Sequence, residues 1–264
     1  MRFQVTVFRL LLTAGIIACP FSTERACVAE ESSGPAAEPV STEKLAERFA
    51  EASDRDEQRT LREQLIAAGE RAIHDIYRQA DNHENARTRL RCYELLSEEF
   101  GDFEEVHERI ARDGLRDLSE DVRYHCAFAV GKLKIYAGHR RLRRLMDDSK
   151  QPEYVRHAAA KSLAELAEPD VIKQLVEMMQ NDRFMARHMG NLGAKALTGR
   201  NLEDFNDYKY GEGAFVSGGV EASFDVAPEH YHNLVAKRHQ AIADYCAWLA
   251  KERPEIYKHI GVSW

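Results

Sequence analysis

The chain has 264 residues, of which 44% are hydrophobic and 31% charged, and its formal net charge at pH 7 is −7. This composition is typical of a soluble α-helical protein with a sizeable core and polar outer faces. An excess of acidic residues disfavours general binding to nucleic acid, whose phosphates carry the same charge. We therefore expect no nucleic-acid partner.

Residues 1–18 have the pattern of an export signal. Arg2 and Arg9 supply positive charge, and residues 10–18, LLLTAGIIA, are apolar but too short to span a bilayer. We expect this signal to place the mature protein outside the cytoplasm, in the periplasm or the cell envelope.

Two cleavage sites fit this signal. The sequence IIAC, which ends at Cys19, resembles the lipobox of bacterial lipoproteins, and that resemblance implies a lipid on Cys19 and attachment to a membrane. Alternatively, Cys27-Val28-Ala29 suits an ordinary signal peptidase, and the signal then extends to residue 29. Residues 30–40, EESSGPAAEPV, contain Pro, Gly, Ser and Glu without apolar periodicity, so we predict a disordered linker over residues 19–40.

Between residues 41 and 199, apolar residues recur at helical spacing in successive pairs of segments. The first pair starts at a Ser41 or Thr42 cap and is expected to close one end of a stack. Pro152 and Pro169 lie where later helices should start. That position tolerates proline because the first-turn amide has no intrahelical partner.

The clearest helix-and-turn unit is residues 114–133. Asp117 closes the turn, and Ser119 is the expected N-cap of the helix. The apolar face of this helix contains small residues, so another backbone can approach it closely. The residues of this face are Val122, Cys126, Ala129, Val130 and Leu133.

An apolar residue followed by arginine recurs through these units. Arg123 follows a valine, and the same pattern returns at Arg156 and Arg187, at intervals of 33 and 31 residues. In the preceding unit, Arg87 keeps the six-residue interval from an aspartate, whereas Arg89 keeps a 34-residue period. Periods of this length predict stacked helix pairs, because no pair can bury its apolar face alone.

The pattern of an Asp-containing turn followed by Val-Arg and two alanines resembles HEAT repeats of the bacterial, phycobilisome-lyase-like type, over roughly residues 41–199. The resemblance implies an all-α protein, a right-handed α-solenoid of helical hairpins. It also implies that Asp117 and Arg123, with Arg156 and Arg187 in later units, form a structural ladder rather than a catalytic site.

The repeat pattern stops after residue 199. Residues 200–228 are rich in glycine and aromatic residues and predict a loop, in which AFVSGGVEASF suits a small hairpin. Residues 229–264 predict a capping helix and tail, since a repeat stack otherwise ends on an uncovered apolar face. The predicted stripe of this helix is Leu234, Ile242, Tyr245, Trp248 and Leu249, with Lys237, Arg238, Asp244 and Lys251 facing water.

No phosphate-binding glycine loop, nucleophile elbow or zinc-protease motif occurs in the sequence. We therefore predict no cofactor and no enzyme activity. The densest group of ligand-type residues lacks the close ligand pairs of zinc sites, so we assign no metal site. This group is His230, His232, His239 and Cys246.

Four arginines surround Leu142 in the predicted first helix of one repeat. Arginine forks suit phosphate or carboxylate, so these residues are a candidate partner surface. The alternative is ion pairing with nearby acids such as Asp147 and Asp148. The four arginines are Arg140, Arg141, Arg143 and Arg144.

We predict a monomeric, non-enzymatic extracytoplasmic scaffold or adaptor that binds an unknown protein partner through its solenoid surface. Two alternatives follow from other features. The family resemblance implies a phycobilin-lyase-like accessory protein, which needs a chromophore. The arginine group favours a binder of an anionic ligand.

Overall fold

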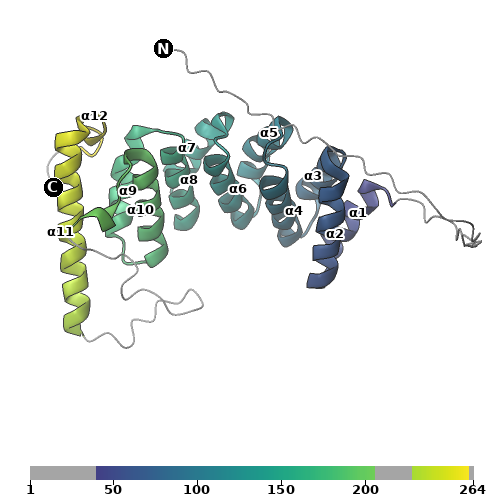
Figure 1. Cartoon of the computed structure of the whole chain (residues 1–264), viewed down its shortest axis with the longest axis horizontal. Helices are drawn as coiled ribbons and strands as arrows, with labels where there is room; N and C mark the ends of the chain where they lie inside the picture. The colour runs from purple at the N-terminus through teal and green to yellow at the C-terminus, as the bar shows by residue number, and fades with distance from the viewer. Residues whose placement is uncertain (1–39, 206–227, 262–264) are drawn as a thin grey trace, which may run out of the picture. The chain divides into compact units, whose positions relative to one another are not determined.

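A computed structural model describes residues 40–205 and 228–261. These residues form helices and short connections and contain no strand. Up to residue 198 the helices follow one another as hairpins (Figure 1). The hairpins are α1 (Thr42–Glu51) with α2 (Arg55–Ala68), α3 (Ile73–Asn82) with α4 (Ala86–Glu99), α5 (Glu104–Arg112) with α6 (Glu120–Lys132), α7 (His139–Asp147) with α8 (Glu153–Glu165), and α9 (Ile172–Gln180) with α10 (Phe184–Thr198).

From α4 onward, each hairpin packs on the next mainly through its second helix. The helices α4, α6, α8 and α10 contact one another in sequence and lie side by side in Figure 1. Glycine permits the close approach of α6 and α8, because a Cβ atom on Gly131 would lie 2.8 Å from the Cα atom of Ser162. The predicted all-α solenoid of helical hairpins is therefore confirmed.

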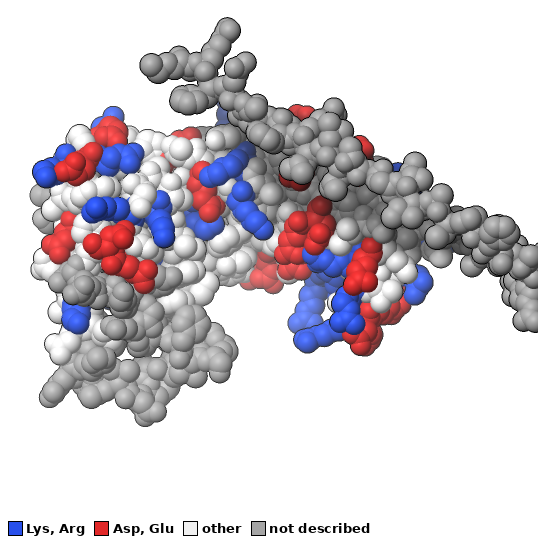
Figure 2. Space-filling view, viewed as in Figure 1, with Lys and Arg blue, Asp and Glu red and all other residues white. Residues whose placement is uncertain are grey.

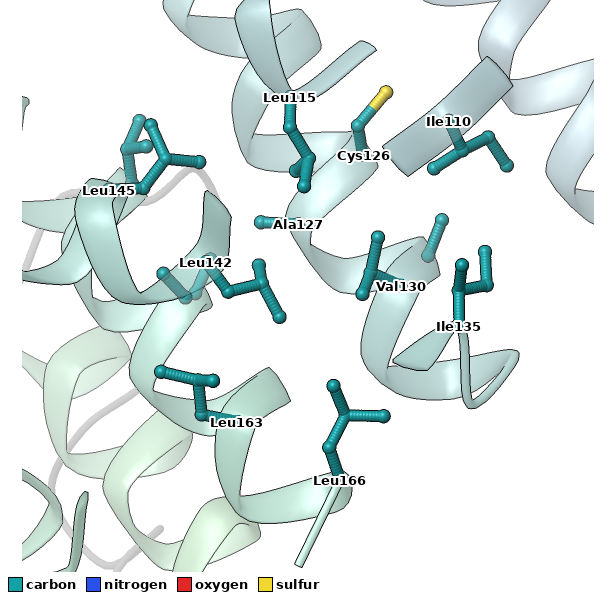
Figure 3. Packing of buried hydrophobic residues seen from close by; sticks show 14 of the residues in the cluster. Ile110, Leu115, Cys126, Ala127, Val130, Ile135, Leu142, Leu145, Leu163 and Leu166 are labelled. Carbon is teal, nitrogen blue, oxygen red and sulfur yellow. The ribbon is translucent and has the colours of Figure 1, made fainter. Parts of the chain in front are cut away.

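Large aliphatic side chains hold the first helices onto this stack. Figure 3 shows Leu142 of α7 between Val130 of α6 and Leu163 of α8, and all three side chains are fully buried. Burying one leucine contributes about 2 kcal/mol. Leu142 and Leu145 thus anchor α7, in which four of the nine residues are arginine.

Side chains that accept backbone hydrogen bonds start several helices. The side chain of Ser41 accepts from the N–H of Lys44, as the sequence predicts. Asp117 Oδ1 accepts from the N–H of Ser119 at 2.7 Å before α6. Ser119 is the N-cap residue of α6, as predicted, but its side chain makes no capping hydrogen bond. The carboxylate of Asp117 instead holds the backbone of Ser119 itself, which fixes the turn before the helix.

The C-terminal helices close the end of the stack. The predicted capping helix is confirmed, since Ile242, Tyr245 and Leu249 are buried and α11 packs on α9. Trp248 is half-buried, with its ring centroid 6.0 Å from that of Tyr245. The elements of this cap are the short 3-10 helix η5 (Leu202–Asp204), α11 (Pro228–Glu252) and α12 (Pro254–Tyr257).

Arg238 lies on the buried side of α11, and the prediction that it faces water is wrong. It precedes Ile242 by four residues and Tyr245 by seven, so it shares their face of the helix. Its side chain is only 7% exposed, and its guanidinium reaches Asp182 Oδ1 at 3.3 Å. The aliphatic part of the arginine is thus buried while its charge pairs with an exposed carboxylate.

The described cysteines are buried free thiols. Burial raises the pKa of Cys92 to about 12 and the pKa of Cys126 well above its usual value. Both thiols are therefore protonated and unreactive at neutral pH.

Several predictions lie outside the described residues. They are the export signal, Cys19, most of the linker, and the hairpin within residues 206–227. Among the helices that the structure does describe, none is both long and apolar enough to cross a membrane.

Candidate anion-binding surface

A nearly buried ion pair of the solenoid joins two neighbouring repeats. The guanidinium of Arg89 donates to both carboxylate oxygens of Asp117, at 2.8 and 2.7 Å. The two side chains are 10% and 8% exposed. Arg89 also donates to the backbone carbonyls of His83 and Glu84. The hydrogen bonds to Asp117 raise the pKa of Arg89, and their effect is larger than the lowering that burial causes.

This pairing differs from the predicted pair of Asp117 with Arg123. Arg123 donates instead to the backbone carbonyl of Asp117 at 2.7 Å, and its Nε donates to Gln151 Oε1 at 3.0 Å. Gln151 in turn donates to Asp148 at 3.0 Å. Arg89 and Arg123 are each the fourth residue of their helix. Each side chain therefore folds back onto the turn before its own helix and also reaches the turn of the next repeat. Arg89, rather than Arg87, is the equivalent residue in the earlier repeat.

Arg156 and Arg187, the equivalent residues of the later repeats, make only part of this set of hydrogen bonds. Arg187 donates to the backbone carbonyls of Asn181 and Asp182. The buried Nε of Arg156 has no hydrogen-bond partner among the described residues. The turn before Arg156 is longer, because Asp148 precedes it by eight residues whereas Asp117 precedes Arg123 by six. The ladder arginines that bond to the backbone are occupied within the fold, so we assign them no ligand.

The arginines of α7 have different surroundings from the ladder. Arg143 pairs with Asp170 at 2.6 Å and with Glu168 at 3.9 Å. Asp147 and Asp148, the partners considered from sequence, form no ion pair with these arginines within the described part of the chain. Intramolecular pairing with acids therefore accounts for Arg143 alone, through acids of the following repeat.

The other three arginines of α7 line a cavity of about 330 Å³ between repeats. We call this cavity the arginine pocket. Five arginines and one glutamate line this pocket, so its charge is predominantly positive. The surface near α2 and α4 differs, because basic and acidic side chains lie close together there (Figure 2). The pocket is lined by Glu108, Ala111, Arg112, Arg116, Ala137, Arg140, Arg141 and Arg144.

Two of the five arginines are held by the protein. Arg112 pairs with Glu108 at 3.0 Å and with Asp113 at 2.9 Å, and Arg141 donates to the backbone carbonyl of Ala111. The remaining three are exposed, and their side chains make no hydrogen bond or ion pair within the residues that the structure describes. These three are Arg116, Arg140 and Arg144.

The charges in the pocket repel one another. Burial lowers the pKa of Arg141, the nearby charges of Arg116 and Arg144 lower it further, and Asp113 opposes the shift. An anion that enters the pocket offsets this repulsion. Guanidinium groups donate in parallel to carboxylate or phosphate oxygens, so the exposed arginines can share one oxyanion.

Sequence reasoning missed Arg112 and Arg116. They belong to the preceding repeat and reach α7 only through the stacking of hairpins. Arg112 precedes Arg144 by 32 residues, which is close to the repeat period. That interval is the signal from which the second half of the pocket was predictable.

The histidines and cysteine near the C-terminus do not assemble into a site among the described residues. His239 is exposed, whereas Cys246 is 7% exposed and faces the core. The side chains of His230 and His232 lie outside the described residues. The described residues contain no group of three or more His, Cys, Asp or Glu side chains that could hold a metal ion.

The stretch from α5 to α10 carries both the pocket and most of the ladder. Its residues 108–189 match the family model of HEAT repeats. The match supports a HEAT-repeat protein. HEAT repeats build helical scaffolds for protein interaction, and the arginine pocket lies within the matched stretch. No curated protein matches the chain.

Proposed function

We propose that this protein is a non-enzymatic extracytoplasmic scaffold that binds an acidic segment of a partner protein in the arginine pocket. The observation that carries the proposal is the group of Arg116, Arg140 and Arg144, which are exposed and make no ion pair among the described residues. Glu108 is the one acid among the residues that line the arginine pocket, and it already pairs with Arg112.

The strength of such contacts favours a protein segment over a small anion. An exposed ion pair contributes about 0.2–1 kcal/mol, so a single carboxylate would bind the pocket weakly. A segment with several acids gathers several of these contacts, and its other residues add buried apolar area. HEAT hairpins offer an extended surface for that purpose.

The export signal and Cys19 support the proposed location. If Cys19 carries the lipid, residues 20–40 link the membrane to the first helix, and the pocket reaches partners near the envelope surface. Residues 30–40, which contain Pro, Gly, Ser and Glu and no apolar periodicity, suit this spacing role.

A comparison of affinity captures tests the proposal. The full chain, an Arg140→Gln/Arg144→Gln variant and an Arg55→Gln/Arg87→Gln control each capture proteins from an envelope fraction, and mass spectrometry identifies what binds. The control removes the same charge from exposed arginines outside the pocket. We expect a stoichiometric partner with an acidic segment that is captured by the parent and the control and lost by the pocket variant. Equal capture by all three chains contradicts the proposal.

A further inference from the structure

A second cavity, of about 580 Å³, adjoins the arginine pocket, because Arg116 lines both. The second cavity lies beside the turn between α3 and α4 and the turn before α6. We call it the acidic pocket. It is lined by Asp81, Asn82, His83, Glu84, Arg89, Tyr93, Asp113, Arg116, Asp117 and Leu118.

The acids of the acidic pocket fall into two groups. Asp117 is occupied by Arg89, and Asp113 is occupied by Arg112 and by the hydroxyl of Tyr77. Asp81 and Glu84 are exposed, and their carboxylates make no hydrogen bond or ion pair within the described ranges. The acidic pocket therefore offers two available negative charges.

Two adjoining cavities thus present opposite available charges. The arginine pocket offers Arg140 and Arg144, the acidic pocket offers Asp81 and Glu84, and Arg116 stands between them. Leu118, which lines the acidic pocket, is 94% exposed. A ligand that crosses Arg116 meets an anion site on one side, and on the other side a cation site that includes an apolar side chain.

We propose that the two cavities form one groove for a partner segment in which acidic residues are separated from basic residues along the chain. This inference rests on the proposed function and specifies the chemistry of the partner. A uniformly acidic segment long enough to cross Arg116 would bring its carboxylates beside Asp81 and Glu84, where like charges repel. A segment whose basic end lies in the acidic pocket replaces that repulsion with attraction, so charge order sets the specificity.

Synthetic peptides of one composition test the charge order. One peptide carries an acidic block, a neutral spacer and a basic block, and a second carries the same residues with the charges alternated. Spacers of two, five and eight residues cover the unknown span at about 3.3 Å per extended residue. A third peptide has the acidic block and spacer alone. Fluorescence anisotropy with the full chain measures each dissociation constant.

We expect the charge-separated peptide, at its best spacer, to bind at least about fivefold more tightly than the alternated peptide. The Asp81→Asn/Glu84→Gln variant should lose this preference and still bind the acidic-block peptide as the parent does. The Arg140→Gln/Arg144→Gln variant should lose binding of both. Thermal unfolding that matches the parent confirms that these surface changes leave the fold intact.

The outcomes separate the two proposals. If the acidic block binds but the basic block adds nothing, or if Asp81→Asn/Glu84→Gln keeps the preference, the charge-divided groove is wrong and the proposed function stands. If no peptide binds and vesicles of anionic lipid bind instead, both proposals are overturned.

Discussion

Replacing Asp117 by asparagine tests the ladder that joins the repeats. The substitution keeps the side-chain volume and an oxygen that can accept from the N–H of Ser119, but it removes the negative charge. Arg89 then stays buried without its counter-ion. Loss of one partner from a buried ion pair costs about 3–5 kcal/mol, and we expect about 3 kcal/mol because the carbonyls of His83 and Glu84 still accept from Arg89.

For a domain of this size, 3 kcal/mol corresponds to a fall of about 6–12 °C in the melting temperature. Thermal unfolding followed by circular dichroism measures it. The control is Asp56→Asn, which breaks the pair with Arg59, whose side chains are 80% and 69% exposed. That change should shift melting by less than about 3 °C. If Asp117→Asn also melts within that range, the inter-repeat ion pair does not stabilise the stack as the buried geometry implies.

Three further outcomes are expected. Trp248→Ala should cost about 2 kcal/mol and lower melting by about 4–8 °C, because the half-buried indole packs in the cap; a parent-like melting curve contradicts this. Burial lowers the pKa of His125, whose Nε2 lies 2.9 Å from Ser97 Oγ. As the pH drops below about 6.5, the unfolded chain therefore takes up the proton before the folded chain does, and the stability of the fold falls. His125→Gln should show a shallower loss between pH 7 and 5 in urea titrations, and an unchanged slope assigns the loss to other groups. Intact mass spectrometry of the mature protein should show a lipid-bearing Cys19 or an unlipidated start at Glu30, and an unprocessed cytosolic chain refutes export.

The fold was largely predictable, because the repeat period of the sequence reflects how the helix pairs stack. Each hairpin buries its face only against its neighbours, so spacings of 31 to 34 residues between equivalent arginines define a stack. The capping helix followed from the same reasoning, since the last hairpin leaves an apolar face. Arg238 was assigned wrongly, because a local pattern does not show that an arginine stem lies on the buried face of its helix. Ser119 was placed correctly at the N-cap, but the sequence does not show that its side chain makes no capping hydrogen bond.

The side-chain partners were harder to predict, because they join different repeats. Asp117 lies six residues from Arg123 but bonds through its carboxylate to Arg89, 28 residues away. The arginine pocket likewise combines α7 with Arg112 and Arg116 of the preceding repeat. A single helix therefore displays half of the site, and the second half requires the stacking of hairpins.

Binding of an acidic peptide to the isolated full chain is the direct test of the arginine pocket. A labelled peptide rich in glutamate is titrated against the parent, the Arg140→Gln/Arg144→Gln variant and the Arg55→Gln/Arg87→Gln control, at low and at high salt. We expect binding that weakens with added salt, that persists in the control and that falls at least about fivefold in the pocket variant. Equal affinity of the pocket variant and the control would contradict it.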